Sequence, residues 1–254
     1  MEAIEPGIIA LLVLVAGVAG LVDAIAGGGG LLCLPALLAA GLSPAQALAT
    51  NKLQGSFGTF SSTLHFIRQG RIDLFAMRWL VFWTMLGAIA GTALVQSIDQ
   101  AFMARIVPWL LACAAFYFLF SPRLGDEDAH RRVGEGLFAL IFGLTLGFYD
   151  GFFGPGTGSF WVLALVALQG DGLIKATAKT KLVNFTSNIV SLFVFILGGQ
   201  VVWTVGLAMA IGQLIGGRVG ASLVLSRGAS IVRPMLVIVS LAITAKLLLG
   251  RVAI

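Results

Sequence analysis

Charged residues are scarce in this sequence of 254 residues. Asp, Glu, Lys and Arg make up 11% of the chain, less than half of the roughly 25% that soluble domains carry. So few charges cannot cover a water-facing surface of ordinary size, which excludes an ordinary soluble domain. The apolar runs are long and continuous, which favours helical spans over the short alternating segments of a transmembrane barrel. We therefore predict an all-α polytopic membrane protein, with the lipid bilayer as a partner.

Histidine and cysteine are almost absent too, with two of each. Cys33 and Cys113 both lie in apolar runs, so we expect small buried side chains rather than a disulfide or a metal pair. No clustering of His, Cys and carboxylates indicates a metal site, and we expect no cofactor. The glycine-rich stretch at 154–159 lacks the Gly-Lys-Ser/Thr ending of a phosphate loop. These observations argue against an enzyme.

The charges that are present lean towards the basic side, with a net charge of +5. In a membrane protein such an excess reflects basic cytoplasmic loops, so we expect no nucleic-acid partner. The first residues, Met-Glu-Ala-Ile-Glu-Pro, are acidic and lack a basic leader. We therefore expect the first apolar run to be a retained membrane segment rather than a cleaved signal peptide.

The apolar runs predict about eight full spans and two short half-helices. The expected full spans are 7–26, 45–67, 79–95, 105–120, 133–149, 174–197, 201–219 and 231–249. The short runs are 31–40 and 159–168. Ten residues of helix rise about 15 Å, roughly half of a bilayer core, so each short run predicts a broken or re-entrant helix.

The two halves of the chain resemble each other. Residues 45–72 align without a gap with 174–201, which places Lys52 on Lys181, and Asp23 aligns with Asp150. Weak internal symmetry of this kind is typical of transporters. We therefore predict a first membrane repeat at 1–120, a charged cytoplasmic linker at 121–132 and a second membrane repeat at 133–254.

Each repeat has five apolar segments, an odd number, so the second repeat should enter the membrane from the opposite side. Loop charges agree with this inverted topology, because basic loops stay in the cytoplasm. The arginines of these loops are Arg68, Arg71, Arg78, Arg123, Arg131, Arg132, Arg218, Arg227 and Arg233. Lys246 and Arg251 do not follow the pattern.

Glycine runs precede both half-helices. A half-helix that starts near the middle of the bilayer has free backbone N–H groups and the positive end of its dipole, and glycine lets a ligand approach them. The sequence therefore predicts an anion site at Gly28, Gly29, Gly30, Gly154, Gly156, Thr157 and Gly158. Alternatively, these glycines only permit tight helix packing.

Lys52 and Lys181 are the most telling residues, because a charge inside a span is costly and usually functional. Polar residues accompany both lysines, and we predict that they bind the anion together: Thr50, Asn51, Gln54, Asn184 and Asn188. In the alternative interpretation the lysines snorkel to the interface and the amides join helices.

Asp23 and Asp150 would oppose an anion if both were ionised and faced the site. Each could pair with Lys52 or Lys181, or cap the N-terminus of a half-helix. Alternatively, one of them carries a coupled proton.

Three motifs resemble those of the TauE/SafE family of sulfite and organosulfonate exporters, also called the toluene-sulfonate uptake permease family, and its YfcA-like subgroup. They are Asp-Ala-Ile-Ala-Gly-Gly-Gly-Gly-Leu-Leu at 23–32, Ala-Leu-Ala-Thr-Asn-Lys-Leu-Gln at 47–54 and Gly-Phe-Tyr-Asp-Gly-Phe-Phe-Gly-Pro-Gly-Thr-Gly-Ser-Phe at 147–160. The resemblance covers about residues 7–249. It implies secondary transport of small sulfur-containing anions across the inner (plasma) membrane of a bacterium.

The resulting hypothesis is an alternating-access carrier that exports such anions, with proton coupling as one option for its driving force. The alternatives are a passive anion channel or a membrane-embedded hydrolase, which would need a nucleophile and base. The patterns Gly87-x-x-x-Gly91 and Gly212-x-x-x-Gly216 could serve packing within one chain or in a homodimer.

Overall fold

The computed structural model describes residues 5–119 and 128–228, and within them every regular element is a helix. The helices are α1 (Pro6–Ala26), α2 (Gly30–Ala39), α3 (Pro44–Arg68), α4 (Arg78–Ser97), α5 (Gln100–Leu119), α6 (Glu135–Phe152), α7 (Thr157–Ala164), the π-helical turn η1 (Leu165–Gln169), α8 (Leu173–Leu197) and α9 (Trp203–Arg227). The all-α prediction is confirmed for this part of the chain.

Five of these helices are long and apolar enough to cross a membrane: α1, α4, α6, α8 and α9. Helix α3 is as long as α8, with 25 residues. Its many polar side chains make it less apolar than the five helices of this group. The predicted span at 231–249 and most of the linker at 121–132 lie outside the described residues. The count of eight full spans and the inverted repeat therefore stay predictions.

Glycines end and restart the helices near the predicted breaks. Helix α1 stops at Gly27, whose φ of 75° is left-handed. Gly156, with a φ of 88°, immediately precedes α7. Residues other than glycine adopt this region at a cost of about 1–2 kcal/mol. Helix α3 has a different start signal. Ser43 and Gln46 form a reciprocal capping box around Pro44 at its first turn.

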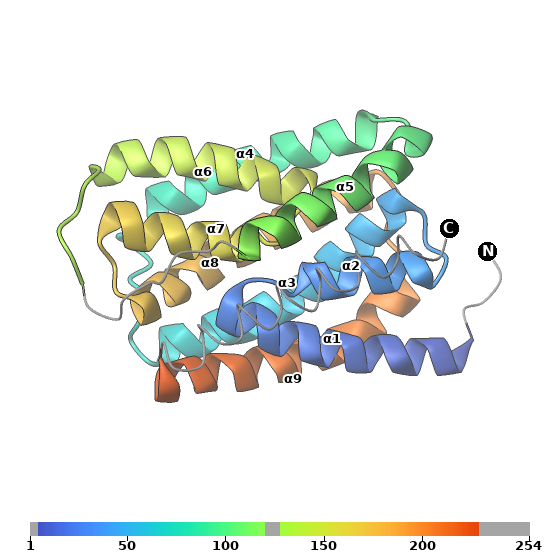
Figure 1. Ribbon diagram of the computed structural model, residues 1–254, viewed down its shortest axis with the longest axis horizontal. Helices are drawn as coiled ribbons and strands as arrows, with labels where there is room; N and C mark the ends of the chain where they lie inside the picture. Colours follow the sequence, from blue (N-terminus) through green and yellow to red (C-terminus); the bar gives the residue numbers. More distant parts are fainter. Residues whose placement is uncertain (1–4, 120–127, 229–254) are drawn as a thin grey trace.

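Figure 1 shows how the helices are arranged. Helices α1 and α9 lie side by side along one edge, and α4 and α6 lie side by side along the opposite edge, with α3 and α8 between them. The half-helices α2 and α7 both start near the middle of the bundle and run towards opposite ends. The glycine breaks therefore lie at the centre of the molecule.

The two edge pairs pack backbone to backbone. A Cβ on Gly212 or Gly216 would overlap backbone oxygens of α1, and a Cβ on Gly87 or Gly91 would overlap those of α6. Small residues allow this close approach of membrane helices. Both Gly-x-x-x-Gly faces thus serve packing within one chain.

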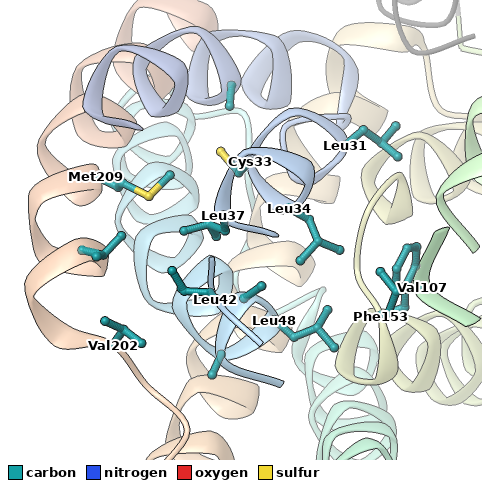
Figure 2. Close-up of a cluster of buried hydrophobic side chains, with 14 of the residues drawn as sticks. Leu31, Cys33, Leu34, Leu37, Leu42, Leu48, Val107, Phe153, Val202 and Met209 are labelled. Carbon is teal, nitrogen blue, oxygen red and sulfur yellow. The ribbon is translucent and has the colours of Figure 1, made fainter. Parts of the chain in front are cut away.

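Two apolar cores lie on either side of the centre. The first contains Leu31, Leu34 and Leu37 of α2 together with Phe153, as Figure 2 shows. The second contains Trp161 of α7 with residues of α3, α4, α6 and α8. Each half-helix is thus anchored in its own core, which fixes where its first turn lies.

Basic side chains gather at one end of the bundle, where α3 and α9 end and α4, α6 and α8 begin (left in Figure 1). We call this the basic end; its residues are Arg68, Arg71, Arg78, Arg131, Arg132, Lys175, Lys179 and Arg227. Arg105, near the start of α5, is an exception among the described residues. Arg218, predicted to lie in a basic loop, lies inside α9 because that helix continues to Arg227. The clustering agrees with the loop charges from which a cytoplasmic side was predicted.

Candidate functional site

The two glycine breaks touch each other at the centre of the bundle. A Cβ on Gly27 would lie 2.5 Å from the Cα of Gly158, and a Cβ on Gly158 would lie 2.5 Å from the Cα of Gly27. Next to this crossing, the hydroxyl of Ser159 donates a hydrogen bond to the backbone oxygen of Ala26. The end of α1 and the first turn of α7 are therefore held against each other by contacts that only glycine permits.

A polar cavity of about 40 Å³ lies beside this crossing. It is bordered by α1, α2, α3, α6, α7, α8 and α9. Its lining residues are Asp23, Gly27, Gly29, Gly30, Asn51, Lys52, Gly55, Thr59, Asp150, Gly154, Thr157, Gly158, Asn184, Asn188 and Gln213. Residues of both predicted repeats thus converge on one site.

Most of the residues that the sequence singled out lie on this cavity, and the others lie just behind it. The residues outside the lining are Gly28, Thr50, Gln54, Gly156 and Lys181. Thr50 accepts a hydrogen bond from the backbone N–H of Val202, 3.2 Å away, and so joins α3 to the residue preceding α9. In this structure Thr50 connects two elements instead of facing the cavity.

Lys52 is the cation in the cavity wall. Its Nζ lies 2.6 Å from Oδ1 of Asp150 and 3.1 Å from Oδ1 of Asn188. The second oxygen of Asp150 accepts a hydrogen bond from the Ser187 hydroxyl. The lysine does not snorkel to an interface but crosses from α3 to α6 and α8.

Lys181 and Asp23 form the second pair, between α8 and α1. The lysine Nζ donates to the backbone oxygen of Asp23 and lies 3.3 Å from its Oδ2. The other carboxylate oxygen of Asp23 accepts a hydrogen bond of 3.4 Å from the N–H of Gly29, just before α2. Each aspartate thus pairs with the lysine of the other half, and Asp23 also supports the start of a half-helix.

Hydrogen bonds orient the asparagine amides of the cavity. The Oδ1 of Asn51 accepts from Gln54, 2.8 Å away, and the Oδ1 of Asn188 accepts from Lys52. The Nδ2 of Asn51 therefore remains as a donor for a ligand. It lies on the side of Gly30, at the start of α2. Asn184 directs its Nδ2 towards Gly158 at the start of α7. Gln54, predicted to bind the anion directly, instead positions Asn51.

Gln213 is a cavity residue that the sequence did not indicate. Its side chain fills the space left by Gly20 of α1 and Gly58 of α3, where a Cβ on either residue would meet its Oε1. Its Nε2 lies 3.7 Å from the Sγ of Cys33, which in turn donates to Gln54. In the alignment of the halves Gln213 falls on Ala88, so a search for repeated polar residues passes over it.

A second group of charges lies away from the cavity, at the basic end. Buried Asp171 pairs with Lys175 at 3.0 Å and Lys179 at 2.6 Å. Asp128 accepts a hydrogen bond of 2.6 Å from the N–H of Gly172 at the start of α8. This bond and Lys175 hold the pKa of Asp128 below its usual value. The group attaches the chain before α6 to α8.

The central cavity thus combines amide donors, one lysine and two half-helix N-termini. Such a set of groups stabilises negative charge. Together with Lys181, which lies behind the wall, Lys52 balances the charges of Asp23 and Asp150. The fold and the site together define a helical membrane protein with a polar, charged centre.

Comparison with known proteins places this centre in a family. The sulfite exporter TauE/SafE family matches residues 12–247, and the chain belongs to that family. The chain is 51% identical over 245 residues to the probable membrane transporter protein YfcA of Escherichia coli K12, covering 96% of this chain and 91% of that protein. It is 48% identical over 240 residues to a probable membrane transporter protein of Haemophilus influenzae, covering 94% of each.

More distant similarity extends to the probable membrane transporter protein YunE of Bacillus subtilis, which is 25% identical over 242 residues. No solved structure matches this chain significantly. The family and its relatives confirm the predicted resemblance. The protein is a membrane-embedded transporter of the TauE/SafE family.

Proposed function

We propose that this protein is a secondary transporter that carries small sulfur-containing anions, sulfite or organosulfonates, through the central cavity by alternating access. The observation that carries the proposal is the convergence of Lys52, the amides of Asn51 and Asn184, and the first turns of α2 and α7 on one cavity. Donors of this kind can replace the water around an oxyanion. The family description supports a sulfur oxyanion as the cargo.

The size of the cavity supports a small cargo. A volume of about 40 Å³ gives room for about three water-sized groups. The sulfur and three oxygens of a sulfite or a sulfonate head group match this scale. A larger organosulfonate would bind by its head group, with its tail outside this volume.

A carrier is favoured over a passive channel by what surrounds the cavity. The core around Leu34 and Phe153 lies on one side, and the core around Trp161 and Phe138 lies on the other. A channel needs a polar path to both faces at once, whereas a carrier opens one side at a time. An apolar core on each side of the cavity therefore fits a carrier better than a channel.

The arrangement of the helices supports inverted repeats as the moving parts. Helix α1 packs on α9, and α6 packs on α4. In the alignment of the two halves α1 corresponds to α6 and α9 corresponds to α4, so the two packed pairs are equivalent. In Figure 1 α2 and α7 run in opposite directions. Rocking of one half against the other around the crossing of Gly27 and Gly158 would open the cavity to each face in turn.

We place the protein in the bacterial inner membrane, with the basic end in the cytoplasm, and export as its direction. The bacterial relatives and the loop charges support the first two points. The word exporter in the family description supports the third. Coupling to protons through Asp23 or Asp150 would provide a driving force.

Sulfite flux in proteoliposomes tests the proposal. The matched variants are Lys52→Ala combined with Asp150→Asn, which removes one ion pair from the cavity, and Lys175→Ala, which removes a lysine of the basic end. We expect saturable flux and counterflow for the unaltered protein and Lys175→Ala, and loss of both for the double variant. Absence of flux for sulfite, methanesulfonate and thiosulfate would remove this cargo class, and flux without saturation or counterflow would indicate a channel.

A further inference from the structure

The two lysine–aspartate pairs of the site are unequal. Asp150 has a side chain that is 5% exposed, lies 2.6 Å from Lys52 Nζ and also accepts from Ser187. Asp23 has a side chain that is 20% exposed, and its Oδ2 lies 3.3 Å from Lys181 Nζ. Both carboxylates border the same cavity, but one is tightly bonded on both oxygens and the other is loosely held.

The difference extends to how each lysine is anchored. Lys181 donates to the backbone oxygen of Asp23 as well as to its carboxylate. This backbone bond persists when the carboxylate is neutral. Lys52 has no backbone oxygen among its bonds and depends on the side chains of Asp150 and Asn188. Protonation of Asp150 would therefore leave Lys52 without its main partner, whereas protonation of Asp23 would leave Lys181 in place.

Ser187 is the reason that the two sites differ. In the alignment of the halves it falls on Gly58, which lies beside Gln213 and offers no hydroxyl to Asp23. Asp23 instead accepts on its second oxygen the longer hydrogen bond, 3.4 Å, from the N–H of Gly29. Asp150 is therefore the more firmly held of the two carboxylates.

Charge balance then requires a proton when an anion binds. Before it binds, the charges of Lys52 and Lys181 balance those of Asp23 and Asp150. A bound monoanion would leave one negative charge uncompensated in a medium where unpaired charge is expensive. One proton on either aspartate restores neutrality.

We infer that Asp23, rather than Asp150, takes up this proton, so that one proton binds with each anion. The inference rests on the proposed anion transport and adds the residue that couples it to pH. With Asp23 neutral, Lys181 keeps its backbone anchor and its positive charge balances the anion.

The groups facing Asp23 are compatible with this exchange. Helix α8 contributes Lys181, α2 contributes the thiol of Cys33, and α3 and α6 contribute the pair of Lys52 and Asp150 across the cavity. From α9 only the neutral amide of Gln213 reaches the cavity, and the segment of α7 has no titratable side chain. Lys181 is thus the one cation in direct contact with Asp23 among the described residues.

Carbon-13 NMR of the full-length protein labelled at the aspartate carboxyl carbons tests the inference. The spectra of Asp23→Asn and Asp150→Asn serve only to assign the two signals. In the unaltered protein we expect sulfite to move the Asp23 signal to the position of a protonated carboxyl and to leave the Asp150 signal at that of a carboxylate. Movement of the Asp150 signal, or of neither signal while sulfite binds, would overturn the inference.

Proton uptake provides a second readout. We expect the unaltered protein to take up about one more proton per bound sulfite than Asp23→Asn, because the variant has lost the acceptor. The subtraction removes the protons that sulfite itself takes up. Equal uptake by the two proteins would overturn the inference and leave the transport proposal standing. Failure of the unaltered protein to bind sulfite, methanesulfonate and thiosulfate by calorimetry would instead overturn the transport proposal, and the coupling with it.

Discussion

Gly27 and Gly158 touch through their backbones, with 2.5 Å between the position of a Cβ on Gly27 and the Cα of Gly158. This contact joins the end of α1 to the first turn of α7, next to the break from which α2 starts. Because Gly27 also has a φ of 75°, a side chain there is opposed by both the backbone conformation and the space.

We predict that Gly27→Ala destabilises the protein strongly. The left-handed conformation costs about 1–3 kcal/mol, and the overlap with Gly158 adds about 1–3 kcal/mol. Gly70→Ala is the matched control, because Gly70 has a φ of 67° and nothing within 4 Å of an added Cβ. Thermal unfolding in detergent should show a larger fall in Tm for Gly27→Ala. Equal falls would mean that the crossing tolerates a side chain.

The pair of Lys52 and Asp150 leads to a second prediction. Lys52→Ala should lower the free energy of unfolding by about 3–5 kcal/mol, because it leaves Asp150 buried without a cation. Adding Asp150→Asn should recover most of this loss, since an amide can still bond to Ser187. The double-mutant cycle is measured by unfolding of the four proteins. If the double variant is as unstable as Lys52→Ala, the unpaired carboxylate of Asp150 is not the cause of the lost stability.

The sequence predicted the half-helices well because their signals are local. The run Gly27 to Gly30 and the glycines at 154, 156 and 158 mark both breaks, and the predicted run at 31–40 became α2 at Gly30–Ala39. The capping residues Ser43 and Gln46 likewise act within one turn. Such features depend on neighbours in the chain, which a sequence displays directly.

The partners of the charged residues could not be assigned in the same way. Lys52 and Asp150 are 98 residues apart, and Lys181 and Asp23 are 158 apart. Each lysine could have met either aspartate until the packing of α3 and α8 was known. Gln213 was missed because its role depends on empty space at Gly20 and Gly58 in two other helices.

Gln213 gives a third prediction, which concerns selectivity. Gln213→Ala removes a side chain from the cavity wall, and neighbouring glycines cannot refill the space. We expect the ratio of ethanesulfonate flux to sulfite flux to rise about tenfold, the scale of discrimination per methylene in a pocket. Competition in proteoliposomes measures this ratio.

Gln96→Ala is the control for that experiment. Gln96 donates a hydrogen bond of 3.2 Å to the backbone oxygen of Val194, and it lies outside the central cavity. Its loss should change stability without changing the flux ratio. A rise in the ratio for Gln96→Ala as large as for Gln213→Ala would indicate a general loosening of the bundle rather than a wider site.

The basic end supplies the last prediction, which concerns orientation. Gln69 follows α3 and His130 precedes α6, both at the basic end, whereas Ser97 ends α4 at the other end; all three are exposed. Because basic loops stay in the cytoplasm, a membrane-impermeant maleimide added to intact cells should label Ser97→Cys. It should label Gln69→Cys and His130→Cys only after permeabilisation, with the protein that has no added cysteine as the blank. The reversed pattern would place the basic end outside, and labelling of His130→Cys together with Ser97→Cys would contradict a span formed by α5.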